Sequence, residues 1–180
     1  MAAKPKAERR ATEPGAAEAL RGPALRRILL ASTGSPFDEK VIGQALELAA
    51  PEGAKVTVLS VARVWGTALG LPHPGLQPTA LEWEAQREIV TRASKIIRRR
   101  GLPVAVKLIR ARNAPKQIAR WADHLRSQAI VMADPELPRW RRIVEGTAWR
   151  DVARRTRIPV HAVPTAAEVR PSWRPRRTRA

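Results

Sequence analysis

The sequence contains no cysteine. This absence excludes disulfide bonds, thiolate metal sites and cysteine nucleophiles, and it gives no sign of an oxidising compartment. No apolar stretch reaches the roughly 18 residues that indicate a membrane-spanning helix, and residues 1–30 lack the apolar run of a signal peptide. We therefore expect a cytoplasmic protein.

The sequence also lacks the common motifs of nucleotide and metal chemistry. It has no G-x-x-x-x-G-K-[ST] loop, no G-x-G-x-x-G after its first apolar run, and no H-E-x-x-H. The three histidines, His73, His124 and His161, are far apart and show no metal-ligand spacing. We expect neither catalytic residues nor a metal, and therefore no enzyme activity.

Charge is plentiful but mostly of one sign, with a net charge of +18. Residues 1–27 carry seven Lys or Arg against three Asp or Glu, and residues 165–180 carry five against one. Arginines occur along the whole chain, which is typical of a generally basic surface. Arg98–Arg100 end a predicted helix, where the helix dipole favours cations. The alternative is non-specific binding of nucleic acid through the tails and Arg patches.

Three regions differ in composition. Residues 1–26 and 165–180 are rich in Pro, Arg and Ala without a sustained apolar period, so we predict a flexible basic leader and a flexible Arg-rich tail. Residues 27–164 alternate short apolar runs with helical periods, which predicts one α/β domain. The predicted strands are 28–31, 56–61, 104–109, 129–133 and 159–164.

Predicted helices separate these strands. Ser35 before Pro36 is typical of a helix N-cap and first helical residue, and Pro51 to Gly53 ends that helix. A second helix covers about 80–100, a third begins at Asn113 with Pro115, and a last one begins at Gly146–Thr147. The alternation predicts a five-stranded parallel sheet, doubly wound and Rossmann-like, with helices on both faces.

The order and spacing of these segments resemble the universal stress protein family over roughly residues 26–165. The first strand and turn, Arg27 to Ser35, the fourth strand, Gln128 to Met132, and the closing Arg157 to Pro164 carry the resemblance. The resemblance implies the strand order 3-2-1-4-5. A ligand would then lie beyond the carboxyl ends of strands 1 and 4, at Ser32–Ser35 and Ala133–Thr147.

Nucleotide-binding members of the family carry G-x2-G-x9-G-[ST] in the second of these segments. Here Gly146–Thr147 matches its end, whereas Ala133 and Glu136 occupy the positions of the first two glycines. Thr33 replaces the family's first-strand aspartate, and Pro135 and Pro138 remove amide donors. Arg139, Arg141 and Arg142 supply positive charge close to Gly146.

These departures predict that ATP is bound weakly or not at all. If a nucleotide binds, the resemblance places it against a vestigial pocket of six residues: Thr33, Gly34, Ala133, Arg139, Gly146 and Thr147. We therefore expect a stress-response or signalling module that works by dimerising and binding partners.

The same strand order leaves strands 3 and 5 at the edges of the sheet. Lys107 in strand 3 discourages edge-to-edge pairing, whereas strand 5 has no formal charge in Val160, His161, Ala162 and Val163. We predict a homodimer through strand 5.

Overall fold

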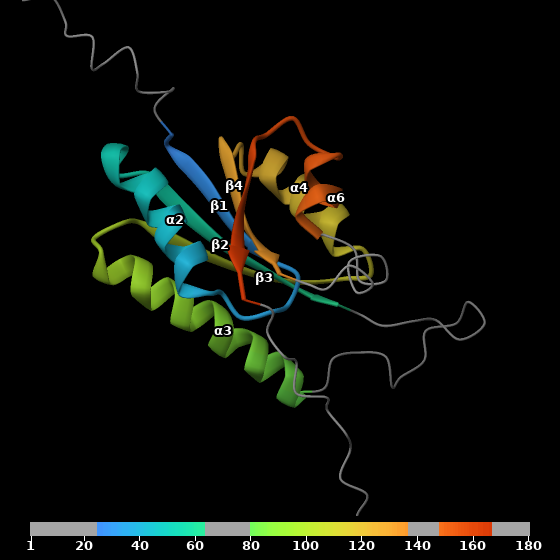
Figure 1. Cartoon of the computed structure of the whole chain (residues 1–180). Coiled ribbons are helices and arrows are strands. Elements are labelled where there is room, and N and C mark those ends of the chain that lie inside the picture. The colour runs from blue at the N-terminus through green and yellow to red at the C-terminus, as the bar shows by residue number, and fades with distance from the viewer. Residues whose placement is uncertain (1–24, 64–79, 137–147, 167–180) are drawn as a thin grey trace, which may run out of the picture.

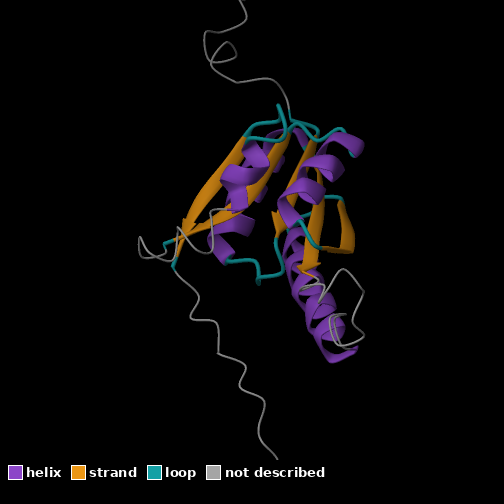
Figure 2. Cartoon of the chain, turned by 90° about the vertical axis from the view of Figure 1, so that its right-hand side faces the viewer, coloured by secondary structure: helices purple, strands orange, loops and turns teal. Residues whose placement is uncertain are grey.

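The computed structural model describes residues 25–63, 80–136 and 148–166, which form one three-layer α/β domain (Figures 1 and 2). Strands and helices alternate as the apolar runs predict. The elements are β1 (Arg27–Ser32), α2 (Glu39–Ala49), the short 3-10 helix η1 (Ala50–Glu52), β2 (Lys55–Arg63), α3 (Ala80–Arg99), β3 (Val104–Ala111), α4 (Ala114–His124), β4 (Ala129–Pro135), α6 (Ala148–Ala153) and β5 (Val160–Thr165).

All five strands run parallel in the order β3-β2-β1-β4-β5. This confirms the predicted fold class and the strand order that the family resemblance implied. Parallel strands covered on both faces are apolar throughout, which explains the continuous runs in β1 and β4. Leu29, Leu30 and Ile130 are fully buried.

Each face of the sheet carries its own hydrophobic cluster. Val41, Ile42 and Ala45 of α2 pack with Val90 and Ile97 of α3 against one face. The other face is covered by α4 and α6, whose Ile118, Ala122 and Val152 form the second cluster. Figure 1 shows α2 and α3 on one side of the strands and α4 and α6 on the other.

Most predicted helix boundaries are found, but the first one is wrong. Asp38, and not Ser35, is the N-cap of α2, because its carboxylate accepts a hydrogen bond from the Lys40 amide at 2.8 Å. Ser35 and Pro36 belong instead to the connection after β1. An aspartate three residues further on therefore satisfies one of the free amides at the start of the helix.

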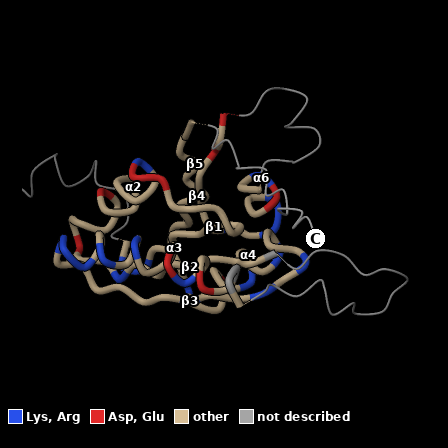
Figure 3. The backbone as a smooth tube through the Cα atoms, turned by 90° about the horizontal axis from the view of Figure 1, so that it is seen from below, with Lys and Arg blue, Asp and Glu red and all other residues tan. Residues whose placement is uncertain are grey.

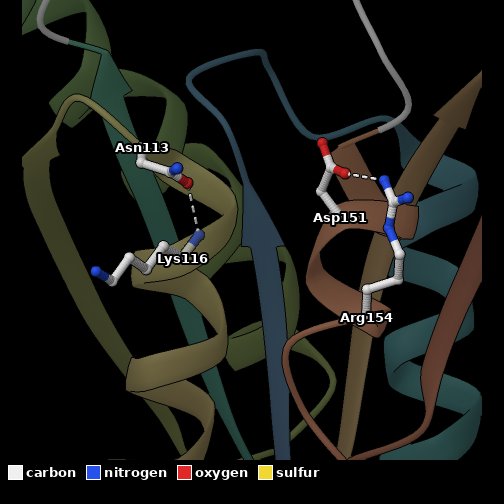
Figure 4. Close-up of polar contacts among 4 residues, drawn as sticks. All are labelled: Asn113, Lys116, Asp151 and Arg154. Carbon is white, nitrogen blue, oxygen red and sulfur yellow. Dashed lines mark hydrogen bonds and ion pairs between the residues drawn. The ribbon is translucent and has the colours of Figure 1, made fainter.

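The other predicted boundaries agree more closely. Asn113 is the N-cap of α4 and accepts a hydrogen bond from the Lys116 amide at 3.0 Å (Figure 4). Gly101 follows α3 with a φ of +76°, as expected for a helix-ending glycine. The predicted start of the last helix, Gly146–Thr147, lies outside the described residues.

In the described ranges, no helix has the length and apolar content needed to cross a membrane. Nor do these ranges bring three His, Asp or Glu side chains together in a way that could hold a metal ion.

Candidate functional site

The order in which successive strands are added to the sheet reverses between β1 and β4. β1 pairs with β2 as far as Ser32 opposite Ser60, but its pairing with β4 ends at Leu30 opposite Val131. The chain leaves β1 toward β2 and arrives at β4 on the other side, which makes this a topological switch point. The turn after β1 and the end of β4 lie at the same end of the sheet, as the family resemblance implies.

The turn after β1 is held by a hydrogen-bonded network. The Gln86 side chain of α3 donates from Nε2 to the carbonyl oxygen of Gly34 at 2.8 Å. Its Oε1 accepts a hydrogen bond from the Ser60 hydroxyl at 2.9 Å. Ser60, in β2, is completely buried. Three elements distant in sequence therefore fix the position of one backbone carbonyl at the switch point.

Gly34 is required at its position for two reasons. Its φ is +101°, a conformation that residues with a Cβ rarely adopt. A Cβ built there would also lie 3.3 Å from the carbonyl oxygen of Val61. Beside it, the Ser32 hydroxyl donates to the Ser35 carbonyl at 2.5 Å, and Thr33 is half-buried. The predicted site residues Thr33 and Gly34 are thus both in this turn.

Sequence reasoning missed Ser60 and Gln86. A signal was present, because Gln86 has the helical spacing of the buried Val90, Ala93 and Ile97 on α3. A polar side chain at a core-facing position needs an internal hydrogen-bond partner. Its partners, however, are 26 and 52 residues away, and only the fold identifies them.

The end of β4 continues as a regular strand past the predicted site residue Ala133. Ala133 pairs with Val163, and Pro135 pairs with Thr165. The amide of Glu136 then donates to the Thr165 carbonyl at 2.9 Å. The two positions after Asp134 therefore offer no free amide, since proline has none and that of Glu136 is already bonded.

This segment also carries negative charge. Asp134 is half-buried, and its Oδ1 is buried with no hydrogen-bond partner among the described residues. Glu136 is exposed. Two carboxylates thus follow Ala133 at the edge where the switch point would receive an anion, which makes the approach of a phosphate unfavourable.

The remaining predicted site residues, Arg139, Gly146 and Thr147, lie outside the described residues. Of the three histidines, His73 does too, His124 packs edge-on against Trp121, and His161 is in β5. Over the described ranges, no serine or threonine hydroxyl is hydrogen bonded to a histidine.

Comparison with protein families supports the same architecture. The model of the universal stress protein family matches residues 24–164 of this chain. A comparison with curated protein sequences gave no match.

Solved structures share the fold at low sequence identity. A universal stress protein from Archaeoglobus fulgidus in complex with dAMP is 22% identical, with a TM-score of 0.55 over 78% of this chain and 98% of that one. A universal stress protein in complex with cAMP is 18% identical, with a TM-score of 0.58 and coverage of 79% and 99%. A universal stress protein family member from Burkholderia pseudomallei is 24% identical, with a TM-score of 0.57 and coverage of 81% and 100%.

Proposed function

Because this chain belongs to the universal stress protein family, we propose that it is a non-enzymatic stress-response or signalling module of the cytoplasm. It acts by forming homodimers and binding partners, and it holds nucleotides weakly or not at all. The switch point of the sheet is present, but its chemistry is poorly suited to a phosphate.

The end of β4 is the observation that carries this proposal. An anion at such a site is held by backbone amides that point freely into it, often from glycines. Here Glu136 uses its amide to bind Thr165, and Pro135 has no amide to offer. The Asp134 carboxylate adds repulsion. Two structural neighbours are described as complexes with dAMP and cAMP, so the fold itself accommodates nucleotides, and we attribute the weak binding expected of this chain to these residues.

Native mass spectrometry of the freshly purified full chain tests both parts of the proposal at once. We expect a dimer mass without retained nucleotide, and titration calorimetry with ATP should give a Kd of about 1 mM or weaker, a binding free energy of about −4 kcal/mol. One ATP retained per subunit, or micromolar affinity, would contradict the nucleotide part. A monomer at all concentrations would contradict the dimer part.

A double substitution tests whether the two missing glycines and the Glu136 carboxylate weaken the binding of ATP. The double variant Ala133→Gly, Glu136→Gly restores the two glycines of the family motif and removes one carboxylate. We expect it to bind ATP at least about tenfold more tightly than the parent chain, a gain of about 1.4 kcal/mol. The control Gly43→Ala, Glu47→Gln alters helix α2 and should leave ATP binding unchanged. If both variants bound ATP equally, the missing glycines and the Glu136 carboxylate would not be the reason for weak ATP binding.

The outer edge of β5, which no strand among the described residues covers, supports dimerisation. Carbonyls of Pro159 and Thr165 accept hydrogen bonds from β4, so the alternating pattern of a parallel pair directs the amides of Val160 and Ala162 away from it. Val160 to Val163 are half-buried in the single chain. An unpaired edge without charge is a template for pairing with a second strand.

A further inference from the structure

A long stretch of the chain contains only positive charge. Between Glu88 and Asp123 there are ten Lys or Arg residues and no Asp or Glu. The structure describes every residue of this stretch, which covers the second half of α3, all of β3 and nearly all of α4. We call its cations the β3-side basic face: Arg92, Lys95, Arg98, Arg99, Arg100, Lys107, Arg110, Arg112, Lys116 and Arg120.

The fold brings these ten residues to one side of the molecule. β3 is an edge strand of the sheet, and α3 and α4 cover the sheet on opposite faces. All ten side chains are exposed, and none forms an ion pair with a carboxylate of the described residues. Figure 3 shows Lys and Arg along α3, β3 and α4, where few acidic positions interrupt them.

Two of the cations are held in place by tryptophans on the two faces of the sheet. Lys107 lies 5.6 Å from the ring centre of Trp121 in α4. Arg110 lies 4.4 Å from the ring centre of Trp83 in α3. Positions 107 and 110 point to opposite faces of β3, because side chains alternate along a strand. The positive charge therefore wraps around the β3 edge, and these contacts reduce the rotational freedom of two of its cations.

We propose that the β3-side basic face binds the phosphate backbone of a nucleic-acid duplex without sequence preference. A row of unpaired cations complements a polyanion, and binding releases counterions from it. Seven of the ten residues are arginines, which bind phosphate oxygens with two parallel hydrogen bonds. The face shares no residue with the switch point, so this proposal stands or falls independently of the proposed function.

Two observations favour a duplex over other anionic partners. Binding to a membrane surface is strengthened by apolar side chains that enter the lipid, but Val106 is the only exposed large hydrophobic residue among those described. Recognition of single strands relies on open aromatic rings that stack on bases. Trp83 and Trp121 are half-buried, and each already has a cation over its ring.

Fluorescence anisotropy with a labelled mixed-sequence DNA duplex of about 20 base pairs tests the proposal on the full chain. The face variant is Arg98→Gln, Lys107→Gln, Arg110→Gln, Arg120→Gln. The control variant, Lys40→Gln, Lys55→Gln, Arg155→Gln, Arg157→Gln, removes the same charge from exposed positions elsewhere. We expect the face variant to bind at least about tenfold more weakly at 100 mM NaCl, with a salt slope lower by about two or more. The control should lose less than about threefold.

Equal weakening of the two variants would overturn the proposal, because only net charge would then matter. The proposal would also be overturned if the parent chain did not bind the duplex at 100 mM NaCl. The same holds if the parent chain bound phosphatidylserine vesicles or single-stranded DNA more tightly than the duplex. A charge-preserving variant, Arg98→Lys, Lys107→Arg, Arg110→Lys, Arg120→Lys, should bind the duplex more tightly than the face variant, because it keeps the charge although lysine lacks the paired hydrogen bonds of arginine. Binding as weak as that of the face variant, at an unchanged melting temperature, would also count against the proposal.

Discussion

At the scale of single residues, side-chain hydrogen bonds fix one backbone carbonyl at the switch point. Gly34 allows the sharp turn after β1, and the Gln86 side chain binds the carbonyl oxygen of Gly34. The buried Ser60 hydroxyl donates to Gln86 and so orients its side chain. If the buried Ser60 hydroxyl lost its acceptor, it would remain out of contact with water and without a hydrogen bond. Breaking the network therefore lowers the free energy of unfolding by more than the net contribution of its two hydrogen bonds.

Replacing Gln86 tests this network. Gln86→Ala keeps a good helix former but removes both hydrogen bonds, and we expect it to lower the free energy of unfolding by about 2 kcal/mol. Urea denaturation followed by circular dichroism measures the loss. Gln44→Ala on α2 is the matched control, because Gln44 makes no hydrogen bond with the described residues. A loss no larger than that of the control would contradict the role of Gln86.

Two glycines should respond in opposite ways to the same substitution. Gly34→Ala forces a φ of +101° on alanine and places Cβ 3.3 Å from the Val61 carbonyl oxygen, so we expect a loss of about 2 kcal/mol. Gly43 lies inside α2 with nothing within 4 Å of its added Cβ. Gly43→Ala should therefore stabilise the protein by about 1 kcal/mol. Thermal and urea unfolding of both variants would show whether the signs differ.

At the scale of elements, the central strands β1 and β4 were predictable because burial on both faces makes their central residues apolar. The first residues of the helices were harder to predict, because several polar residues in a connection can act as the N-cap. Ser35 before Pro36 is a good candidate by type, yet Asp38 caps α2. Pairing partners of polar side chains were not predictable at all, since the Gln86 contacts join elements distant in sequence.

The edge of β5 gives a prediction at this scale. Ala162→Pro removes an amide that points away from β4, so the ladder within the sheet keeps its hydrogen bonds. We expect the variant to fold and to sediment as a monomer where the parent chain is a dimer. Val163 is unsuitable for this test, because it packs against the hydrophobic cluster beneath α2. Unchanged dimerisation by Ala162→Pro would place the interface elsewhere.

At the scale of the whole molecule, alternation of elements predicted a doubly wound sheet, whereas the strand order came only from the family resemblance. Periodicity specifies which residues are buried, but it does not specify which strand lies beside which. The sequence also showed the amount of positive charge without showing its placement. Only the position of β3 at the edge gathers ten cations on one side.

Like charges gathered in this way repel one another in the folded state, and salt screens the repulsion. We expect the melting temperature of the parent chain to rise by several degrees between 10 and 300 mM NaCl. The face variant should show a smaller rise than the control variant, although both carry the same net charge. Equal salt responses of the two variants would indicate that the repulsion is spread over the whole surface.

The parallel direction of all five strands has a practical consequence for interaction studies. The chain enters β1 at Arg27 from the amino edge of the sheet and leaves β5 at Thr165 on the carboxyl edge, where the Glu136 amide fastens it. The described chain therefore enters and leaves the domain at opposite ends of the sheet. An affinity handle that replaces residues 167–180 would begin at the end of the sheet that holds Gly34 and Asp134, whereas one that replaces residues 1–24 would leave that end open for a partner.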